Sequence, residues 1–502
     1  MEYVLTGRQM KAVDGYTINE IGIPSLILME HAANAVYEEI QKRYSKDTKI
    51  IAVCGSGNNG ADGVAAARIL KVNGYNPDIL VAGDSSRFTK EMEMQISIVK
   101  NLGIKQVNKT NISEYNLIID GLFGIGLSRN IEGDYYDIIS AINNSKAQVV
   151  SVDIPSGINS ENGSIMGIAV RADATVAFGA VKQGILLYPG AFYAGKTIIN
   201  NAGFPMEALK HCNPKCFTIG EKDIKNMLPE RKPDSNKGSY GKIFAAAGSV
   251  NMCGAAAMCG KAAYRTGAGM VKLFTPKENR VIIQTLVPEA VLCTYDMDNF
   301  SGDGLMKQLN QSTCAVCGPG IGVSDTAKKI VEAVLKSKVK TVLDADALNI
   351  ISQNKNLEEL YHEDVVITPH IGEFSRLTGL ETGMIKSDLV KACKEYAVKH
   401  GITCVLKDAR TVISLKDGST FINTSGNSGM STAGSGDVLA GIIISLISQG
   451  MDMGYAAVLG TYIHGMAGDE AEKAVGGYGM TAMDIVDGII NVLKKYESEN
   501  AR

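Results

Sequence analysis

The sequence predicts an α/β protein made of two doubly wound, three-layer domains. Short apolar segments typical of buried strands alternate with glycine-rich turns and helical segments along most of the chain. This alternation stops once, around residues 205–240, where the sequence becomes polar and contains prolines. Because 502 residues exceed what one ordinary hydrophobic core supports, we expect a domain boundary near residue 218.

Four expected strands define the N-terminal half. Residues 49–54 (KIIAVC) precede the loop GSGNNGADG and a helical segment, and further strands are expected within 77–83, 115–127 and 147–158. In a doubly wound sheet, ligands bind beyond the carboxyl ends of the parallel strands. The loops that follow these strands are therefore the expected position of a site.

A second α/β series follows the boundary. Strands are expected within 242–249, 313–322, 340–348, 364–374 and 402–413. The last motif is the glycine-rich stretch 423–436, which passes into the apolar run 438–447. This run has about half the length that a bilayer-spanning helix needs, so it predicts a buried core helix.

Composition argues against several classes of protein. A net charge of −3 gives no basic field for nucleic acid, and no apolar stretch reaches transmembrane length. The first residues carry acids and no apolar core, so they do not resemble a signal or transit peptide. The ten cysteines are mostly isolated, which indicates reduced thiols and a cytoplasmic location.

The first glycine loop supports two interpretations. Residues 55–60 fit the pattern G-x-G-x-x-G between a strand and a helix, and Asp84 follows the next strand, as in a dinucleotide-binding dehydrogenase. Asp62 argues against that interpretation, because a carboxylate beside a pyrophosphate is repulsive. With Asn58 and Asn59 beside it, the loop is better suited to a hydroxylated ring, a cation, or both.

Two further acids, Asp120 and Asp153, end expected strands on the same rim of the sheet. A single aspartate of this kind is more often a turn residue, but three on one rim favour a site. The oxygen-bearing side chains of Asn59, Asp120 and Ser156, without histidine or cysteine nearby, would suit a hard cation.

Asp437 lies between the last glycine-rich loop and the apolar helix. At a helix N-terminus its carboxylate could simply cap the helix. Alternatively, the free N–H groups there hold a phosphate while Asp437 acts on the group that is being phosphorylated. The loop alone does not decide between the two.

Ordered motifs over nearly the whole chain resemble a known pair of domains. Residues 1–210, through GSGNNGADG, DGLFGIGL and VDIPSG, resemble the epimerase domain for hydrated NADH and NADPH, which is Rossmann-like. Residues 225–500, through AAYRTGAGMVKL, GPGIG, LDADALN, TPHIGEFSRL and GMSTAGSGDVLAG, resemble the ADP-dependent NAD(P)H-hydrate dehydratase, which is ribokinase-like. We therefore expect an epimerase domain at 1–215 and a dehydratase domain at 220–502.

The resemblance implies repair of damaged nicotinamide nucleotides. Hydrated NADH and NADPH exist as two epimers; the epimerase domain interconverts them, and the dehydratase uses ADP to dehydrate the S form, giving NAD(P)H, AMP and phosphate. Implied cofactors are potassium in the epimerase domain and ADP as co-substrate with Mg²⁺. We expect these small molecules as partners, no nucleic acid or membrane, and a homo-oligomer.

For the epimerase domain, the resemblance implies a nucleotide site formed by two loops and by Asp153. We expect Asp153 to transfer a proton, with Asp62 as the second candidate for that role. The loop residues are Asn58, Asn59, Gly60, Ala61, Asp62, Gly124, Ile125, Gly126, Leu127, Ser128, Arg129 and Asn130. Potassium is implied on Asn59, Asp120 and Ser156. Ala61 replaces a usual glycine and is expected to tighten the loop.

For the dehydratase domain, the resemblance implies that Asp437 removes the hydroxyl proton as the substrate attacks the terminal phosphate. The hydrated nucleotide is implied at Ala255, Gly320, His370 and Asp437. ADP is implied at Lys407, Asp408, Ala409, Arg410, Thr411 and Gly436, although Asp408 stands where a glycine is common. Without the resemblance, a histidine at the position of His370 is as often a cap or core residue as a ligand, and Lys407 would simply be a solvated charge.

Two other classes of protein share parts of this pattern. One is a small-molecule kinase on the ribokinase fold, whose phosphorylated product would persist. The other combines the dehydratase with a non-catalytic dinucleotide-binding module at the N-terminus. Product analysis distinguishes the first, and epimer interconversion by the isolated N-terminal half distinguishes the second.

Overall fold

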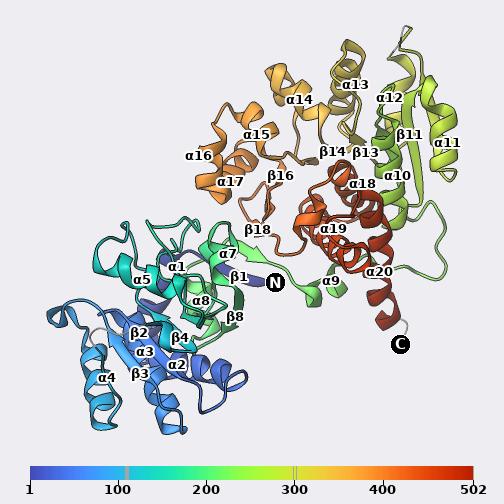
Figure 1. The fold of residues 1–502 in the computed structure, drawn as a ribbon. Helices are drawn as coiled ribbons and strands as arrows, with labels where there is room; N and C mark the ends of the chain where they lie inside the picture. Colours follow the sequence, from blue (N-terminus) through green and yellow to red (C-terminus); the bar gives the residue numbers. More distant parts are fainter. Residues whose placement is uncertain (108–111, 298, 301, 501–502) are drawn as a thin grey trace. The chain divides into compact units, whose positions relative to one another are not determined.

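The chain folds into two compact α/β units (Figure 1). The computed structural model describes residues 1–107, 112–297, 299–300 and 302–500. One unit comprises Glu2–Cys216, and the other comprises Phe217–Arg502 together with Met1. Each unit has its own parallel sheet, which confirms the predicted fold class.

The N-terminal unit contains a six-stranded sheet in the order β3-β2-β4-β5-β6-β8, with every neighbouring pair parallel. Its strands are β2 (Ile50–Cys54), β3 (Asp78–Val81), β4 (Leu117–Gly121), β5 (Gln148–Val152), β6 (Ala174–Phe178) and β8 (Lys196–Asn200). Strands β1 (Glu2–Leu5) and β7 (Val181–Lys182) pair with each other in parallel. From the neighbouring strands β2 and β4 the sheet extends outward in both directions, as expected of a doubly wound sheet.

Helices cover both faces of this sheet. They are α1 (Gly7–Tyr16), α2 (Ser25–Gln41), α3 (Asn58–Val72), α4 (Lys90–Asn101), α5 (Asp134–Asn144), α6 (Gln183–Leu186), α7 (Gly190–Ala194) and α8 (Met206–His211). Apolar residues of α2 and α3 pack on one face, and Ile139 and Ile142 of α5 pack on the other. The unit therefore has three layers, with the predicted loops at the carboxyl ends of its strands.

The C-terminal unit has a larger sheet in the order β12-β11-β10-β13-β14-β15-β16-β17-β18. The strands are β10 (Lys242–Ala246), β11 (Met270–Pro276), β12 (Val291–Tyr295), β13 (Cys314–Cys317), β14 (Lys340–Leu343), β15 (Val365–Ile367), β16 (Thr403–Leu406), β17 (Val412–Ser414) and β18 (Thr420–Ile422), after the short β9 (Cys216–Thr218). Strands β12 to β16 are parallel in this order, whereas β17 and β18 are antiparallel.

Helices again lie on both sides of the C-terminal sheet (Figure 1). They are α9 (Glu221–Met227), α10 (Cys253–Arg265), α11 (Arg280–Leu286), α12 (Asp303–Asn310), α13 (Asp325–Lys336), α14 (Asp346–Gln353), α15 (Ile371–Thr378), α16 (Thr382–Ser387), α17 (Leu389–His400), α18 (Ser435–Ser448), α19 (Met453–Val475) and α20 (Ala482–Asn500). Helices α10, α18, α19 and α20 share one hydrophobic core against the sheet.

The predicted core helix is α18, and the prediction is confirmed. Its residues from Val438 to Ser448 are buried, because α10 and α19 pack beside it. Gly434 precedes the helix with a φ of +90°, a backbone conformation that favours glycine. This sharp entry places Ser435, Gly436 and Asp437 in the first turn, at the carboxyl edge of the sheet.

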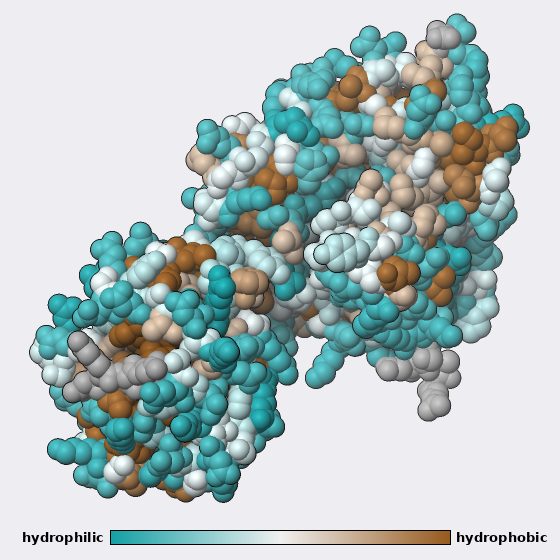
Figure 2. All heavy atoms as spheres, viewed as in Figure 1, coloured by the Kyte–Doolittle hydropathy of each residue, from teal (hydrophilic) through white to brown (hydrophobic). Residues whose placement is uncertain are grey.

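Exposed apolar side chains gather at one end of the C-terminal sheet. Figure 2 shows them at α11, where Val281 is 75% and Ile282 47% exposed, and Val291 of the edge strand β12 is 45% exposed. An unpaired edge strand beside exposed apolar residues is a typical contact surface for other chains. Within the described parts of the chain, no helix combines the length and apolar character needed to cross a membrane.

We predict that the two units fold independently. Each has its own sheet and its own hydrophobic core, and the sequence between them is polar. Pieces 1–215 and 220–502, expressed separately, should each be soluble and should each show one cooperative thermal transition in circular dichroism. Aggregation of both pieces, or a non-cooperative melt of either, would contradict this prediction.

Candidate active sites

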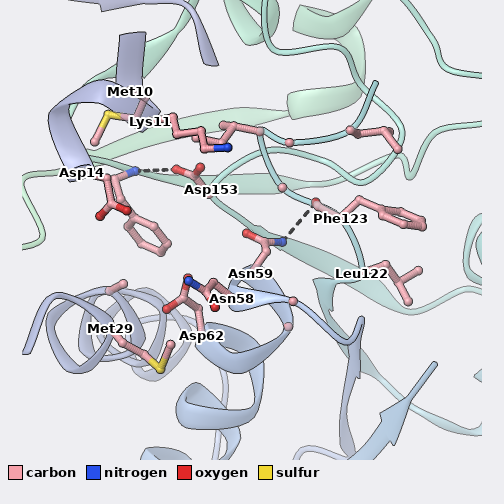
Figure 3. Close-up of a pocket in the computed structure, with 18 of the residues that line it drawn as sticks. Met10, Lys11, Asp14, Met29, Asn58, Asn59, Asp62, Leu122, Phe123 and Asp153 are labelled. Atoms are coloured by element: carbon pink, nitrogen blue, oxygen red, sulfur yellow. Dashed lines mark hydrogen bonds between the residues drawn. The ribbon is translucent and has the colours of Figure 1, made fainter. Parts of the chain in front are cut away.

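The N-terminal unit has a cavity of about 540 Å³ at the carboxyl ends of its strands (Figure 3). Its wall comes from helices α1 and α2, from the first turn of α3, and from the loops after β4 and β5. Figure 3 shows Asn58 and Asp62 on one side of the cavity, with Asp153 and Asp14 on the other. Polar and apolar side chains thus face a space large enough for a nucleotide head group.

Most of the predicted epimerase-site residues line this cavity. Those in the wall are Asn58, Asn59, Gly60, Asp62, Gly124, Ile125, Gly126, Leu127, Ser128, Arg129 and Asp153. Asn130 is exposed outside the wall. Ala61 is fully buried in the hydrophobic core, so its methyl group fills the core and does not narrow the loop, contrary to our expectation.

Asp153 is held by a buried lysine that sequence reasoning did not identify. The Lys182 ammonium forms an ion pair with Asp153 Oδ1, and it also donates a hydrogen bond to the carbonyl oxygen of Phe178 at 2.7 Å. The Phe178 N–H donates to the same Oδ1 at 3.0 Å. Asp153 has a φ of +66°, so tertiary contacts hold it in a backbone conformation that few non-glycine residues adopt.

Two other carboxyl groups of the cavity have raised pKa values. Burial, followed by the charges of Asp153 and Asp14, raises the pKa of Asp62 well above its usual range. Burial and then Asp153 likewise raise the pKa of Asp14. Because like charges close together cannot all ionise readily, Asp62 releases its proton less readily than an exposed carboxyl group would.

The three predicted potassium ligands lie together beneath the cavity. Asp120 is fully buried and accepts hydrogen bonds from Ser156 Oγ at 2.6 Å, Ser156 N at 2.9 Å and Ser151 Oγ at 2.8 Å. The Phe123 carbonyl oxygen lies 3.3 Å from Ser156 Oγ and accepts a hydrogen bond from Asn59 Nδ2 at 3.1 Å. In the described part of the chain, no basic side chain pairs with Asp120.

These oxygen atoms fit a hard cation. A buried carboxylate without a basic partner, beside a hydroxyl and a carbonyl oxygen, is the environment that such ions prefer. Burial raises the pKa of Asp120 although hydrogen bonds from Ser156 oppose the shift, so positive charge there would be favourable. For Asn59 to be a ligand, its side-chain amide would have to rotate so that the oxygen, in place of the nitrogen, points toward the site.

In the C-terminal unit, the ends of β14, β15 and β16 bring together Asp344, His370 and Lys407. Lys407 Nζ lies 2.9 Å from Asp344 Oδ1, which also accepts a hydrogen bond from Thr368 Oγ1 at 2.7 Å. Lys407 and His370 are direct neighbours in a parallel bridge. Lys407 is therefore paired, and it is not merely a solvated charge.

The first turn of α18 faces this pair. A Cβ atom at Gly436 would lie 3.3 Å from Lys407 Nζ and 3.7 Å from Asp344 Oδ2, so only glycine leaves the space between them open. Burial and then the charge of Asp344 raise the pKa of Asp437 to about 7, although Lys407 opposes the shift. Among the described residues, none donates a hydrogen bond to the Asp437 carboxylate, so its side chain does not cap the helix.

His370 is the N-cap residue of α15. Its Nδ1 accepts hydrogen bonds from the backbone N–H groups of Gly372 at 3.0 Å and Glu373 at 3.3 Å, and Glu373 Oε2 accepts from His370 N at 2.8 Å. Burial and then Lys407 lower the pKa of His370, so the ring is neutral at pH 7. The ring thus caps the helix through Nδ1, and its Nε2 lies 3.5 Å from Glu373 Oε1.

The other predicted residues of this half lie around the same edge. Gly320 has a φ of +60°, and a Cβ atom there would lie 2.8 Å from that of Ala255, so these two residues face each other closely. The turn between β16 and β17 is formed by Asp408, Ala409 and Arg410, and it ends at Thr411. Arg410 Nη1 donates to the Thr424 carbonyl at 2.6 Å, which connects this turn to the glycine-rich loop.

Several site residues were missed from the sequence. Lys182 lies in the mostly apolar stretch TVAFGAVKQGILL, and a lysine in such a stretch needs a buried partner. Asp344 ends a strand in the same way as Asp120 and Asp153, so the same argument could have identified it. Met10, Lys11, Asp14 and Met29 reach the cavity from α1 and α2, which no motif connects to it.

A parallel sheet with carboxyl groups at its strand ends, and an open helix N-terminus beside a lysine, define an α/β nucleotide-binding enzyme. The family profile described as NAD(P)H-hydrate dehydratase matches residues 244–491, and that described as YjeF-related protein N-terminus matches residues 25–184. The bifunctional NAD(P)H-hydrate repair enzyme of Moorella thermoacetica is 32% identical over 99% of this chain and 98% of its own length.

Solved structures resemble the C-terminal unit. A ribokinase-like superfamily protein of Enterococcus faecalis is 29% identical, with a TM-score of 0.52, over 56% of this chain and 96% of its own. The ADP/ATP-dependent NAD(P)H-hydrate dehydratase of Bacillus subtilis, co-crystallised with ATP and Mg²⁺, is 28% identical, with a TM-score of 0.50, over 56% and 98%.

The chain belongs to the family of bifunctional NAD(P)H-hydrate repair enzymes. It is an enzyme with an epimerase domain and an ADP-dependent dehydratase domain, as the resemblance of its motifs implied.

We predict that Asp437→Asn stabilises the C-terminal unit in alkaline solution. A carboxyl group whose pKa rises on folding to about 7 favours the folded state while protonated, and this contribution is lost as pH rises from about 4 to 7. The uncharged amide avoids that loss. At pH 8 the variant should have a free energy of unfolding higher by on the order of 2 kcal/mol, after allowance for solvent screening.

The measurement is urea unfolding of the C-terminal unit at pH 5 and pH 8. Asp325→Asn is the matched control, since Asp325 is an exposed acid in the first turn of α13. That change should slightly destabilise the unit at pH 8, because it removes a favourable interaction with the helix dipole. Equal effects of the two substitutions would show that Asp437 behaves as an ordinary helix-terminal acid.

Proposed function

We propose that the edge formed by β14, β15, β16 and α18 carries the dehydratase reaction. Hydroxide is a poor leaving group, so the hydroxyl of the hydrated ring is phosphorylated first. Asp437 takes the hydroxyl proton while the oxygen attacks the terminal phosphorus of ADP, and the bond from that phosphorus to AMP breaks. The ring nitrogen then expels phosphate, and loss of a proton from the neighbouring carbon restores the ring double bond.

The observation that carries this proposal is the position and charge of Asp437. It lies in the first turn of α18 with a pKa raised to about 7, which suits a group that accepts a proton at neutral pH. The backbone N–H groups of Ser435 and Gly436 and the Lys407 ammonium lie where negative charge develops on the transferred group. ADP would lie along residues 407–411, and Mg²⁺ would be the metal ion that accompanies it.

We assign epimerisation to the cavity of the N-terminal unit. Inversion at a carbon that carries both a hydroxyl and the ring nitrogen can proceed by protonation of the hydroxyl, cleavage of the C–O bond with loss of water, and addition of water to the other face of the ring cation with release of a proton. Asp153, paired with Lys182, is suited to stabilise the positive charge on the ring or to accept that proton. Asp62, protonated across the cavity, is suited to donate one. The loop 124–130 would hold the rest of the nucleotide.

Potassium is the cation that we propose for Asn59, Asp120 and Ser156. The buried Asp120 carboxylate and the Phe123 carbonyl oxygen support it. When bound, the ion would neutralise Asp120 and stabilise the backbone of the loop after β4, which lines the substrate cavity. A homo-oligomer and a cytoplasmic location also stay predictions; the exposed apolar residues of α11 and β12 support the former.

The decisive experiment separates the two activities in one chain. A mixture of hydrated NADH epimers is incubated with ADP, and recovery of NADH absorbance and release of AMP are followed. The unmodified chain should repair both epimers. The Asp153→Asn variant should repair the S form, and NADH recovery should then stop, apart from slow spontaneous epimerisation of the other form.

Asp437→Asn should leave both epimers unrepaired, with dehydration slower by on the order of 10²–10⁴. The affinity for ADP should be retained, because the N–H groups of the first turn remain. Near-normal turnover would mean that Asp437 is not the base. A phosphorylated ring compound that accumulates in the mass spectrum would instead indicate a small-molecule kinase.

Potassium dependence should be confined to epimerisation. Replacing K⁺ by tetramethylammonium, which is too large for the Asp120 site, should slow epimer interconversion more than dehydration. Ser156→Ala should raise the K⁺ concentration needed for half-maximal epimerisation by roughly tenfold or more, since a ligand is lost. Epimerisation that proceeds equally well in either salt would remove the ion from this account.

A further inference from the structure

Lys182 is among the largest fully buried side chains of the protein's described residues, and nothing in the proposed mechanism so far requires it. Its side chain is 0% exposed, whereas that of Asp153, its partner, is 12% exposed toward the cavity. Lys182 is among the residues around the cavity, but its side chain has no exposed surface there, so a substrate would meet Asp153 before the lysine. Any effect of Lys182 on the reaction has to pass through the carboxylate.

The hydrogen bonds around Asp153 fix which of its oxygens remains free. Oδ1 receives both the Lys182 ammonium and the Phe178 N–H, and Lys182 is itself fixed by the Phe178 carbonyl oxygen. Among the described residues, none donates a hydrogen bond to Oδ2. Phe178, the last residue of β6, and Lys182 of the short strand β7 thus hold one carboxylate oxygen and leave the other for the cavity.

The charges around Asp153 explain why a buried cation is needed. The carboxyl groups of Asp14 on α1 and Asp62 on α3 face Asp153, and Glu91 acts on Asp14 from farther away. Lys182 is the cation that acts on this group in return, while Lys11 lines the outer cavity. Without Lys182, three carboxyl groups would share the space, and the proton could lie on any of them.

We propose that Lys182 is a positioning residue of the epimerase, which aims Oδ2 of Asp153 at the substrate and keeps the negative charge on Asp153 and the proton on Asp62. This inference rests on the proposed role of Asp153. It extends that role, because it explains how two similar carboxyl groups take opposite parts in one reaction. The left-handed backbone at Asp153 is maintained by the same contacts.

The test begins with Lys182→Met, which keeps the length of the side chain and removes the charge. Epimerisation should fall by roughly 10²-fold or more in kcat, with KM changed less than about threefold, since Lys182 does not touch substrate. The acidic limb of the pH profile of kcat/KM should move to higher pH, because the carboxylate has lost its counter-ion. Lys182→Arg should restore the position of that limb.

Arg68→Met is the matched control. Arg68 also pairs with a carboxylate, Glu30, in the same unit, but it lies outside the cavity wall. Its loss should leave the pH profile of epimerisation unchanged. The thermal transition of the N-terminal unit, followed by circular dichroism on the full chain, reports that this unit is intact in every variant, whereas dehydration of the S epimer reports on the C-terminal unit.

A double substitution distinguishes action through Asp153 from any other role. Asp153→Asn with Lys182→Met removes both charges, so no unpaired buried ion threatens folding, and its epimerisation rate should equal that of Asp153→Asn alone. A further loss in the double variant, a rise in KM alone, or an unmoved pH profile in Lys182→Met would overturn the inference. Normal epimerisation by Asp153→Asn would instead overturn the proposed function of Asp153.

Discussion

The pairing of one strand-end carboxylate with one lysine, fully buried in the N-terminal unit and partly buried in the C-terminal unit, organises each site. Asp153 pairs with Lys182 in the N-terminal unit, and Asp344 with Lys407 in the C-terminal unit. In both units a second carboxyl group lies nearby without a lysine of its own, and its pKa rises: Asp62 in one and Asp437 in the other. A low-dielectric edge with two carboxyl groups and one cation yields a charged group and a proton-carrying group.

This arrangement follows from the geometry of parallel sheets. The carboxyl ends of parallel strands lie on one edge, so aspartates that end strands approach one another there. The edge is partly buried by the loops and helices that follow, which makes uncompensated charge costly. Asp120 shows the alternative solution, in which hydroxyl and backbone donors surround the carboxylate in place of a lysine.

Much of the fold could be predicted because its signals are local. Buried parallel strands such as β2, β4 and β13 are continuous apolar runs that end in glycine, and α18 is an apolar run after a glycine loop. Strands β6, β8, β11, β12 and β18 were among those not predicted; of these, β8 and β12 are half exposed, so they lack the continuous apolar pattern. Asn59, Asp120 and Ser156 were grouped correctly from their strand ends.

The remaining parts of the sites could not be predicted, because they depend on contacts between segments far apart in the chain. Lys182 acts on a residue 29 positions earlier, and Asp14 reaches the cavity from a helix that carries no motif. His370 shows the same limit within one short segment. Its position at a strand end predicts a cap as readily as a ligand, and in the structure Nδ1 caps α15 while Nε2 lies 3.5 Å from Glu373 Oε1. Helix capping therefore accounts for these contacts of the ring, and it holds His370 at the edge of the sheet beside Lys407.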